Sequence, residues 1–174
     1  MKLLIDGSEY IFKTFSFKET EKLGTVLGHQ LGAGDLVALI GELGTGKTCF
    51  TRGIANGLGI DKKVPVVSPS FTLINEYDGP LPLYHFDFYR IDTTTQMLGL
   101  GYEEYFFGKG ITVIEWGEKV EAFLPKEHIT VHFFYQDDEE SREIRIKGHG
   151  KRFVPVMIRF EKFVRETCKI INNC

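Results

Sequence analysis

A glycine-rich segment in the first third of the chain has the residue types needed to hold phosphate. Its glycines let the backbone curl so that successive N–H groups face phosphate oxygens. Lys47 adds a mobile positive charge for the outer phosphates, and the hydroxyl of Thr48 is a ligand for Mg²⁺. The segment meets the full pattern G-x-x-x-x-G-K-[ST] and predicts a nucleotide-binding phosphate loop made of Gly41, Glu42, Leu43, Gly44, Thr45, Gly46, Lys47 and Thr48.

Phosphoryl transfer also needs a carboxylate near the metal and a group that positions water. Two acids are candidates, because Glu115 ends an apolar β-rich run and Asp87 lies near the end of another. Taken alone, each acid could equally be an exposed residue at a strand end without a role in the site. Two neighbours of Asp87 are ambiguous as well. His85 is typical of a packed or hydrogen-bonded histidine rather than a base, and Arg90 can pair with an acid as easily as with phosphate.

A hydroxyl-rich segment, Ser68-Pro69-Ser70-Phe71-Thr72, follows the first predicted strand–loop–helix unit. P-loop proteins often place a segment that senses the γ-phosphate at this point, and these hydroxyls could meet Mg²⁺ or the γ-phosphate. The alternative is a simple turn begun by the proline. The chain has no N-K-x-D pattern of the kind that recognises guanine, which favours adenine.

The elements around the loop are those that the mechanism requires. Ser16-x-x-Glu19 is a capping box, and apolar residues then recur at helical spacing at positions 23, 26, 27 and 31. The continuous apolar run 36–40 predicts a strand buried on both faces, as in a parallel sheet. Directly after the glycines, apolar residues at 50, 54, 55 and 58 predict a second helix, which Gly57 and Gly59 weaken and end.

The rest of the chain completes a single domain. Residues 62–83 are rich in proline and glycine and read as loops, and the runs 128–135 and 143–147 predict two late strands. Pro155 stands where a helix can begin, and one helical face follows at positions 156, 160, 163, 164 and 171. This tail is expected to pack on the sheet, with docking to a partner as the alternative. We expect an α/β P-loop NTPase domain, 1–150, with a mainly parallel, mixed central sheet flanked by helices, and a helical extension, 151–174, packed on it.

Composition sets broad limits on function. The 174 residues are 43% hydrophobic and 26% charged, with a net charge of -3 and no basic block, so a large nucleic-acid footprint is not evident from composition. The three cysteines, Cys49, Cys168 and Cys174, form no C-x-x-C pair and suggest no disulfide framework. No apolar run approaches about 18 residues and the N-terminus lacks an apolar signal region. We therefore expect a cytoplasmic protein without a membrane segment.

Five segments together resemble the TsaE (YjeE) family, the small ATPases of bacterial tRNA threonylcarbamoyladenosine synthesis. They are residues 41–48, 68–73, 85–90, 98–106 and 114–116, in the family's order, within a resemblance that spans about residues 16–147. The departures are small: the family usually has Asp, a small residue and Thr at the positions of Glu42, Thr45 and Cys49, and often Thr at Ser70, while Gly101 looks like an insertion. The tail after residue 150 lies outside the resemblance.

The resemblance implies weak Mg²⁺-dependent ATP hydrolysis, stimulated by a complex of TsaD and TsaB that transfers a threonylcarbamoyl group to an adenosine beside the tRNA anticodon. ATP use would reset that complex between turnovers, and tRNA would be reached only indirectly. Carried over by residue, Lys47 serves phosphate and catalysis, Thr48 holds Mg²⁺, Glu115 is a direct or water-mediated metal partner, and Asp87 orients water. The roles of the two acids could be reversed, so both remain metal candidates. The nucleotide site would also include Cys49, Ser70 and Trp116.

Two other functions fit a short P-loop chain. A small-molecule or nucleoside kinase needs an acceptor pocket and usually an arginine-bearing lid, but only Arg52 and Arg90 follow soon after the loop. A nucleotide-dependent binding switch would use nucleotide to change its affinity for a partner, with hydrolysis incidental. Rates of ATP hydrolysis with and without partner proteins distinguish a partner-stimulated ATPase from these two functions.

Overall fold

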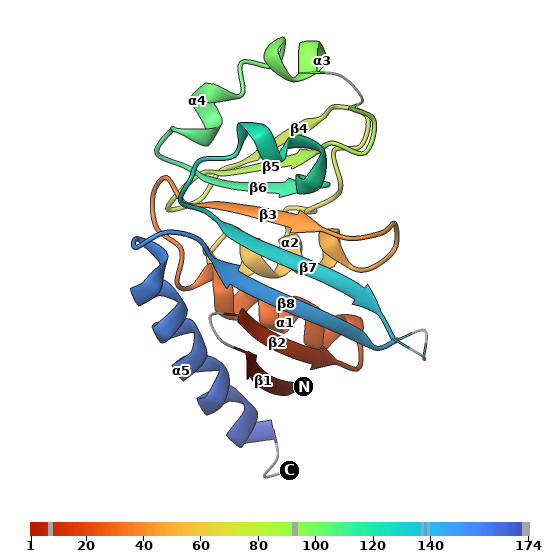
Figure 1. Ribbon diagram of the computed structural model, residues 1–174, viewed down its shortest axis with the longest axis vertical. Helices are drawn as coiled ribbons and strands as arrows, with labels where there is room; N and C mark the ends of the chain where they lie inside the picture. Colours follow the sequence, from red (N-terminus) through yellow and green to blue (C-terminus); the bar gives the residue numbers. More distant parts are fainter. Residues whose placement is uncertain (7–8, 92–93, 137, 139, 172–174) are drawn as a thin grey trace.

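The computed structural model describes residues 1–6, 9–91, 94–136, 138 and 140–171. The elements in chain order are β1 Lys2–Asp6, β2 Glu9–Thr14, α1 Phe17–Gly28, β3 Leu36–Ile40, α2 Lys47–Gly57, β4 Ile74–Tyr77, β5 Leu83–Asp87, α3 Thr94–Leu98, α4 Glu103–Phe106, β6 Ile111–Glu115, the 3₁₀ helix η1 Gly117–Phe123, β7 Ile129–Tyr135, β8 Arg142–Gly148 and α5 Phe153–Ile171. They form one eight-stranded sheet covered by helices (Figure 1).

The strand order is β1-β2-β8-β7-β3-β6-β5-β4. The four inner strands β7, β3, β6 and β5 run parallel, and the pairs on both flanks are antiparallel. The predicted mixed α/β sheet is therefore confirmed, with the parallel character confined to its centre. In this arrangement β3, which leads into the glycine loop, lies between β7 and β6, so the loop emerges in the middle of the sheet.

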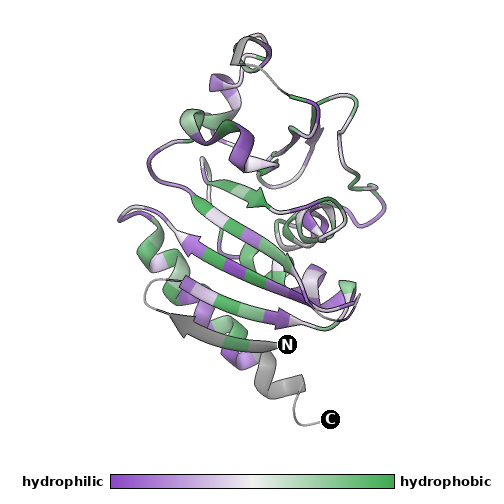
Figure 2. Cartoon of the chain, turned by 45° about the vertical axis from the view of Figure 1, so that its right-hand side comes forward, coloured by the Kyte–Doolittle hydropathy of each residue, from purple (hydrophilic) through white to green (hydrophobic). Residues whose placement is uncertain are grey.

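Two apolar clusters cover the sheet. The larger cluster packs α1, α2 and α5 against β2, β3, β7 and β8, with Phe12, Leu27, Phe50, Val131 and Phe160 among its buried members. The smaller cluster packs α3, α4 and η1 against the opposite face of β3, β5 and β6, through Leu36, Phe86 and Ile114 among others, and α3 and α4 lie at the top of Figure 1. Along β8, buried and partly exposed residues alternate, and Figure 2 shows the matching alternation of hydropathy.

The helices α1 and α2 touch backbone to backbone because glycines line their contact. A Cβ atom added at Gly53 would lie 2.0 Å from the carbonyl oxygen of Glu21, and one added at Gly24 would lie 2.3 Å from that of Phe50. Cβ atoms added at Gly28 and Gly57 would likewise lie 2.5 and 2.4 Å from carbonyl oxygens of the opposite helix. The contact therefore needs glycine on both helices, a constraint that hydrophobic spacing alone does not reveal.

The predicted start of α1 is confirmed. The Ser16 hydroxyl accepts a hydrogen bond from the Glu19 N–H at 3.3 Å, and a Glu19 carboxylate oxygen accepts one from the Phe15 N–H at 2.9 Å. The first bond satisfies a backbone donor that a helix start otherwise leaves without a partner, and the second ties the residue before the cap to the same turn. The capping box thus fixes where α1 begins, next to the phosphate loop.

The C-terminal helix α5 packs as the periodicity predicts. Val156, Phe160 and Val164 are buried, whereas Phe163 at the edge of the same face is 43% exposed, with its ring centroid 6.0 Å from that of His29. The side chain of Ile171 lies outside the described residues. Within the described part of the chain, no helix has the length and apolar character to cross a lipid bilayer.

Three strands were not predicted. β1 and β2 form an antiparallel pair at one edge of the sheet, and β4 lies at the other edge within the region interpreted as loop. β4 has only four residues, and both β2 and β4 are only partly buried, so they lack the continuous apolar signature of the inner strands. Long-range pairing, rather than local pattern, defines them.

Candidate functional site

The glycine loop connects the end of β3 to the start of α2. Gly46 is the N-cap of α2 in the left-handed region, at φ 104°, and no side chain caps the helix. Gly44 also has positive φ, 78°, and a Cβ atom there would lie 2.8 Å from the Tyr135 hydroxyl oxygen. The first N–H groups of α2 and the positive end of its dipole can thus bind an anion.

Lys47 is held inside this loop. Its residue is only 4% exposed, and its Nζ donates to the carbonyl oxygens of Gly41 at 2.7 Å and Glu42 at 2.8 Å. The same ammonium lies 4.1 Å from the ring centroid of Trp116. Burial lowers the pKa of Lys47, and nearby carboxylates, chiefly Glu115, partly oppose that shift. A partly desolvated cation at this position gains from an anionic ligand.

Glu115 lies opposite the first turn of α2. The Thr48 hydroxyl donates to its Oε2 at 3.0 Å, and His85 Nε2 lies 2.9 Å from its Oε1. Glu115 is 3% exposed, so its carboxylate is surrounded by protein on most sides. The hydroxyl and carboxylate oxygens that the sequence proposed as metal ligands therefore lie together.

Asp87 lies beside Glu115, because β5 and β6 pair in parallel with these two residues in register. One Asp87 carboxylate oxygen accepts a short hydrogen bond from the Ser68 hydroxyl, and the other accepts from the Tyr89 N–H at 2.9 Å. The Asp87 N–H in turn donates to the Leu73 carbonyl oxygen at 3.1 Å. The segment that the sequence linked to γ-phosphate sensing is thereby attached to Asp87 at its first residue, Ser68, and through Leu73, the residue that follows it.

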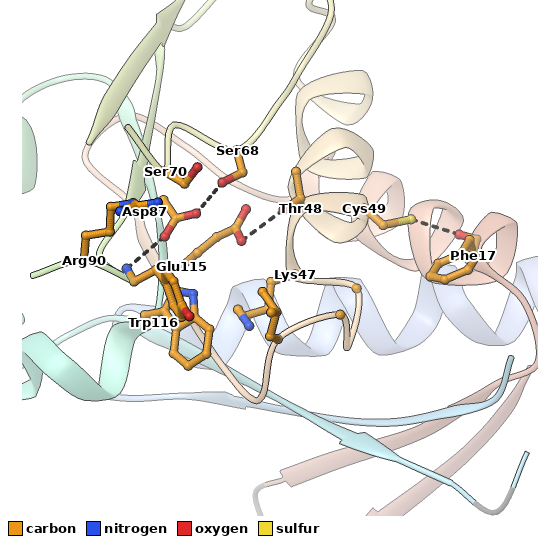
Figure 3. A pocket seen from close by; sticks show the side chains of 14 residues that line it. Phe17, Lys47, Thr48, Cys49, Ser68, Ser70, Asp87, Arg90, Glu115 and Trp116 are labelled. Carbon is orange, nitrogen blue, oxygen red and sulfur yellow. Dashed lines mark hydrogen bonds between the residues drawn. The ribbon is translucent and has the colours of Figure 1, made fainter. Parts of the chain in front are cut away.

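These groups surround one cavity of about 470 Å³ (Figure 3). That volume falls within the usual range for small-ligand sites. Its walls combine the loop, the hydroxyl-rich segment and the ends of β5 and β6, through Phe17, Leu43, Gly44, Gly46, Lys47, Thr48, Cys49, Ser68, Ser70, Asp87, Tyr89, Arg90, Glu115 and Trp116. The predicted residues Cys49, Ser70 and Trp116 are among them.

Three predicted loop residues do not line this cavity. Gly41 and Glu42 contribute carbonyl oxygens that accept from Lys47. Thr45 is buried, and its hydroxyl donates to the Glu42 carbonyl oxygen at 2.8 Å. These residues shape the loop from behind, so their side chains are not placed to contact a ligand in this cavity.

The two ambiguous neighbours of Asp87 are now placed. His85 is fully buried and paired with Glu115, as expected for a packed, hydrogen-bonded histidine. Arg90 lines the cavity, and its guanidinium lies 4.5 Å from the ring centroid of Phe71. Phe71 is itself 83% exposed, so this contact lies at the protein surface.

Two residues far along the chain hold the loop and were not found by sequence reasoning. Arg142 Nε donates to the Thr45 carbonyl oxygen at 3.2 Å, and the Tyr135 hydroxyl donates to the Leu43 carbonyl oxygen at 2.5 Å. Tyr135 of β7 and Arg142 of β8 are register partners, and the arginine Cζ lies 4.7 Å from the tyrosine ring centroid. No local pattern marks residues more than ninety positions away as supports of the loop.

Comparisons with known proteins point to one family. A family model described as "Threonylcarbamoyl adenosine biosynthesis protein TsaE" matches residues 14–144. The tRNA threonylcarbamoyladenosine biosynthesis protein TsaE of Bacillus subtilis (strain 168) is 41% identical over 143 residues, which cover 82% of this chain and 87% of that protein. The protein of the same name from Treponema pallidum (strain Nichols) is 44% identical over 141 residues, covering 81% of this chain and 95% of that one.

A solved structure extends the similarity to the fold. The crystal structure of Bacillus subtilis YdiB superposes with a TM-score of 0.77 at 33% sequence identity, covering 94% of this chain and 98% of that one. The family model includes the glycine loop, Asp87 and Glu115, and thus the whole set of charged groups around the cavity. On these matches, the chain belongs to the TsaE family.

Proposed function

We propose that this protein is a Mg²⁺-dependent ATPase that acts with TsaD and TsaB in the synthesis of threonylcarbamoyladenosine in tRNA. The observation that carries the proposal is the meeting of Lys47, Thr48, Asp87 and Glu115 around one cavity at the start of α2. A phosphate-binding loop, a metal-ligand pair and a second acid are the parts that phosphoryl transfer to water requires. Membership of the TsaE family supports the pathway.

Phosphate would be held by the N-terminal end of α2 and by Lys47. The helix start has no side-chain cap, so its backbone N–H groups can donate to phosphate oxygens. Lys47 Nζ is bonded to two backbone carbonyl oxygens and stacked on Trp116, which places its charge at the loop. These donors stabilise negative charge that develops on the phosphoryl group and the leaving oxygen.

Magnesium fits the pair formed by Thr48 and Glu115. Both groups offer oxygen, the donor that Mg²⁺ prefers, and their atoms lie 3.0 Å apart. No cluster of three or more His, Cys, Asp or Glu side chains suited to a metal occurs among the described residues, so the ion would bind together with the nucleotide's phosphates and water. When bound, Mg²⁺ neutralises charge on the outer phosphates.

Asp87 is assigned to the water side of the site. Its carboxylate is bonded to Ser68 and to the Tyr89 N–H, whereas the Thr48 hydroxyl is bonded to Glu115. This division favours Glu115 as the metal partner and Asp87 as the group that orients or activates water. Attachment of Ser68 to Asp87 also offers a route by which the hydroxyl-rich segment can respond to the γ-phosphate.

The experiment measures phosphate release from ATP by the purified protein, alone and with TsaD and TsaB, at several Mg²⁺ concentrations. We expect slow release alone and faster release in the complex. Lys47→Ala should abolish productive ATP binding, while the exposed Lys62→Ala serves as a matched control and should behave as wild type. Wild-type affinity for ATP in a folded Lys47→Ala protein would overturn the phosphate-loop assignment.

The same assay separates the two other functions. Transfer of labelled phosphate to a small acceptor, with no free phosphate released, would identify a kinase. Partner binding that differs between ATP and ADP states, with no hydrolysis in the complex, would identify a switch. Either result would replace the ATPase proposal.

A further inference from the structure

A buried histidine lies directly behind the proposed metal ligand. His85 is on β5, two residues before Asp87, and therefore projects from the same face of the strand. It is 0% exposed, and its Nε2 lies 2.9 Å from Glu115 Oε1. Because it is sealed from solvent, His85 cannot serve as a base for water in the cavity.

The two oxygens of Glu115 have different partners. Oε1 faces His85, and Oε2 accepts from the Thr48 hydroxyl at 3.0 Å. The terminal torsion of a glutamate is broad, so a single contact would leave the carboxylate plane poorly defined. Contact from behind and in front defines that plane and directs Oε2 toward Thr48.

The second ring nitrogen of His85 indicates which tautomer is present. Among the described residues, Nδ1 is the buried side-chain nitrogen that lacks a hydrogen-bond partner. A proton on Nδ1 would leave a buried donor unsatisfied and would turn the Nε2 lone pair toward a carboxylate oxygen, another acceptor. The geometry therefore favours a proton on Nε2, donated to Glu115.

We propose that His85 is a positioning residue that acts through Glu115: its Nε2–H fixes one carboxylate oxygen so that the other faces Thr48 and the metal of a bound nucleotide. This inference deepens the proposed function and rests on it. His85 touches neither the nucleotide nor the reacting water. Its contribution should therefore appear only where Mg²⁺ takes part in binding, since hydrogen bonds behind a metal ligand set the ligand's orientation.

The test measures ADP affinity by calorimetry with Mg²⁺ and again with EDTA. His85→Leu replaces the donor with an apolar side chain that can fill the buried position, and should weaken Mg²⁺-dependent ADP binding about 10–100-fold while leaving binding in EDTA unchanged. His85→Gln retains an N–H donor and should recover most of the loss. His149→Gln is the matched control, because His149 is bonded to Thr130 at 2.9 Å and does not line the cavity.

A merely structural role for His85 gives a different result. Equal weakening in Mg²⁺ and in EDTA, or no rescue by His85→Gln, would overturn the inference. On a Glu115→Gln background, His85→Leu should add no further loss, because the two residues act as one unit; fully additive losses would also overturn it.

A measurement on the wild-type protein keeps the inference falsifiable if the variants do not fold. Nitrogen NMR of labelled histidine should show His85 with its proton on Nε2, and a proton on Nδ1 alone would overturn the inference. Failure of the proposed function looks different: wild-type protein would then bind ADP equally well with Mg²⁺ and with EDTA, or not at all. That result would remove both proposals, whereas an unaffected His85→Leu removes only this one.

Discussion

Replacing Gly53 by alanine should destabilise the protein, although alanine is the better helix former. The new Cβ atom would lie 2.0 Å from the Glu21 carbonyl oxygen, whereas ordinary contact begins at 3.4 Å. The obstacle is helix backbone, which cannot rotate aside as a flexible side chain can. The two helices must therefore separate by about 1.4 Å locally, which loosens the contacts that bury Leu23, Leu27 and Phe50.

The size of the effect follows from two opposing terms. Forcing extra atoms into a packed contact costs about 1–3 kcal/mol, and a clash with rigid backbone belongs at the upper end of that range. Alanine recovers about 1 kcal/mol through its helix propensity. The net loss is about 2 kcal/mol, which for a chain of this size lowers Tm by about 4–8 °C.

Thermal and urea unfolding of Gly53→Ala measure this loss, and Gly32→Ala is the matched control. A Cβ atom at Gly32 would have only the Asp35 carboxylate within reach, at 3.9 Å, so this change should be neutral or slightly stabilising. A Gly53→Ala protein that is as stable as wild type, or more stable, would refute the close backbone contact of α1 and α2.

Three further predictions concern the site and the sheet. Glu115→Gln and Asp87→Asn should each lower partner-stimulated ATP hydrolysis about 100-fold or more while weakening ADP binding much less, and normal hydrolysis by either variant would remove that acid's role. Trp116 is the only tryptophan, and its ring centroid lies 4.1 Å from Lys47 Nζ, so binding of Mg²⁺–ATP should change its fluorescence until the site is saturated. An unchanged fluorescence in a titration for which calorimetry shows binding would contradict this. Burial lowers the pKa of His149 below its ordinary 6.5, so the unfolded chain takes up this proton at a higher pH than the folded protein. The free energy of unfolding should therefore fall as pH drops through 6.5 toward the folded pKa of His149. His149→Gln should make that fall shallower, as measured by urea unfolding at several pH values between about 5 and 8.

Features fixed by neighbouring residues could be predicted from the sequence. The phosphate loop, the buried strand β3 before it and the helix α2 after it follow from spacing within about twenty residues. The start of α1 follows from Ser16 and Glu19, whose hydrogen bonds reach no farther than four residues. Such patterns can be recognised in the sequence because the partners of each hydrogen bond are close in the chain.

The arrangement of the site depended on pairing between distant segments. The sequence proposed Asp87 and Glu115 separately, but only the parallel pairing of β5 with β6 puts them side by side. The same pairing places His85 behind Glu115, thirty residues away. Strand neighbours are chosen by long-range packing and have no local signature, so the sequence named the acids and the fold decided their partners.

The supports of the loop show the same division. Arg142 reaches the Thr45 carbonyl oxygen across 97 positions of sequence, and Gly53 meets Glu21 across the helix pair. The residue type at position 142 or 53 does not predict such a contact, because arginine and glycine each have many common roles. The sequence by itself determined which chemical groups this protein has, and the tertiary structure decided which of them touch, since contact between distant residues depends on how the whole sheet and its helices pack.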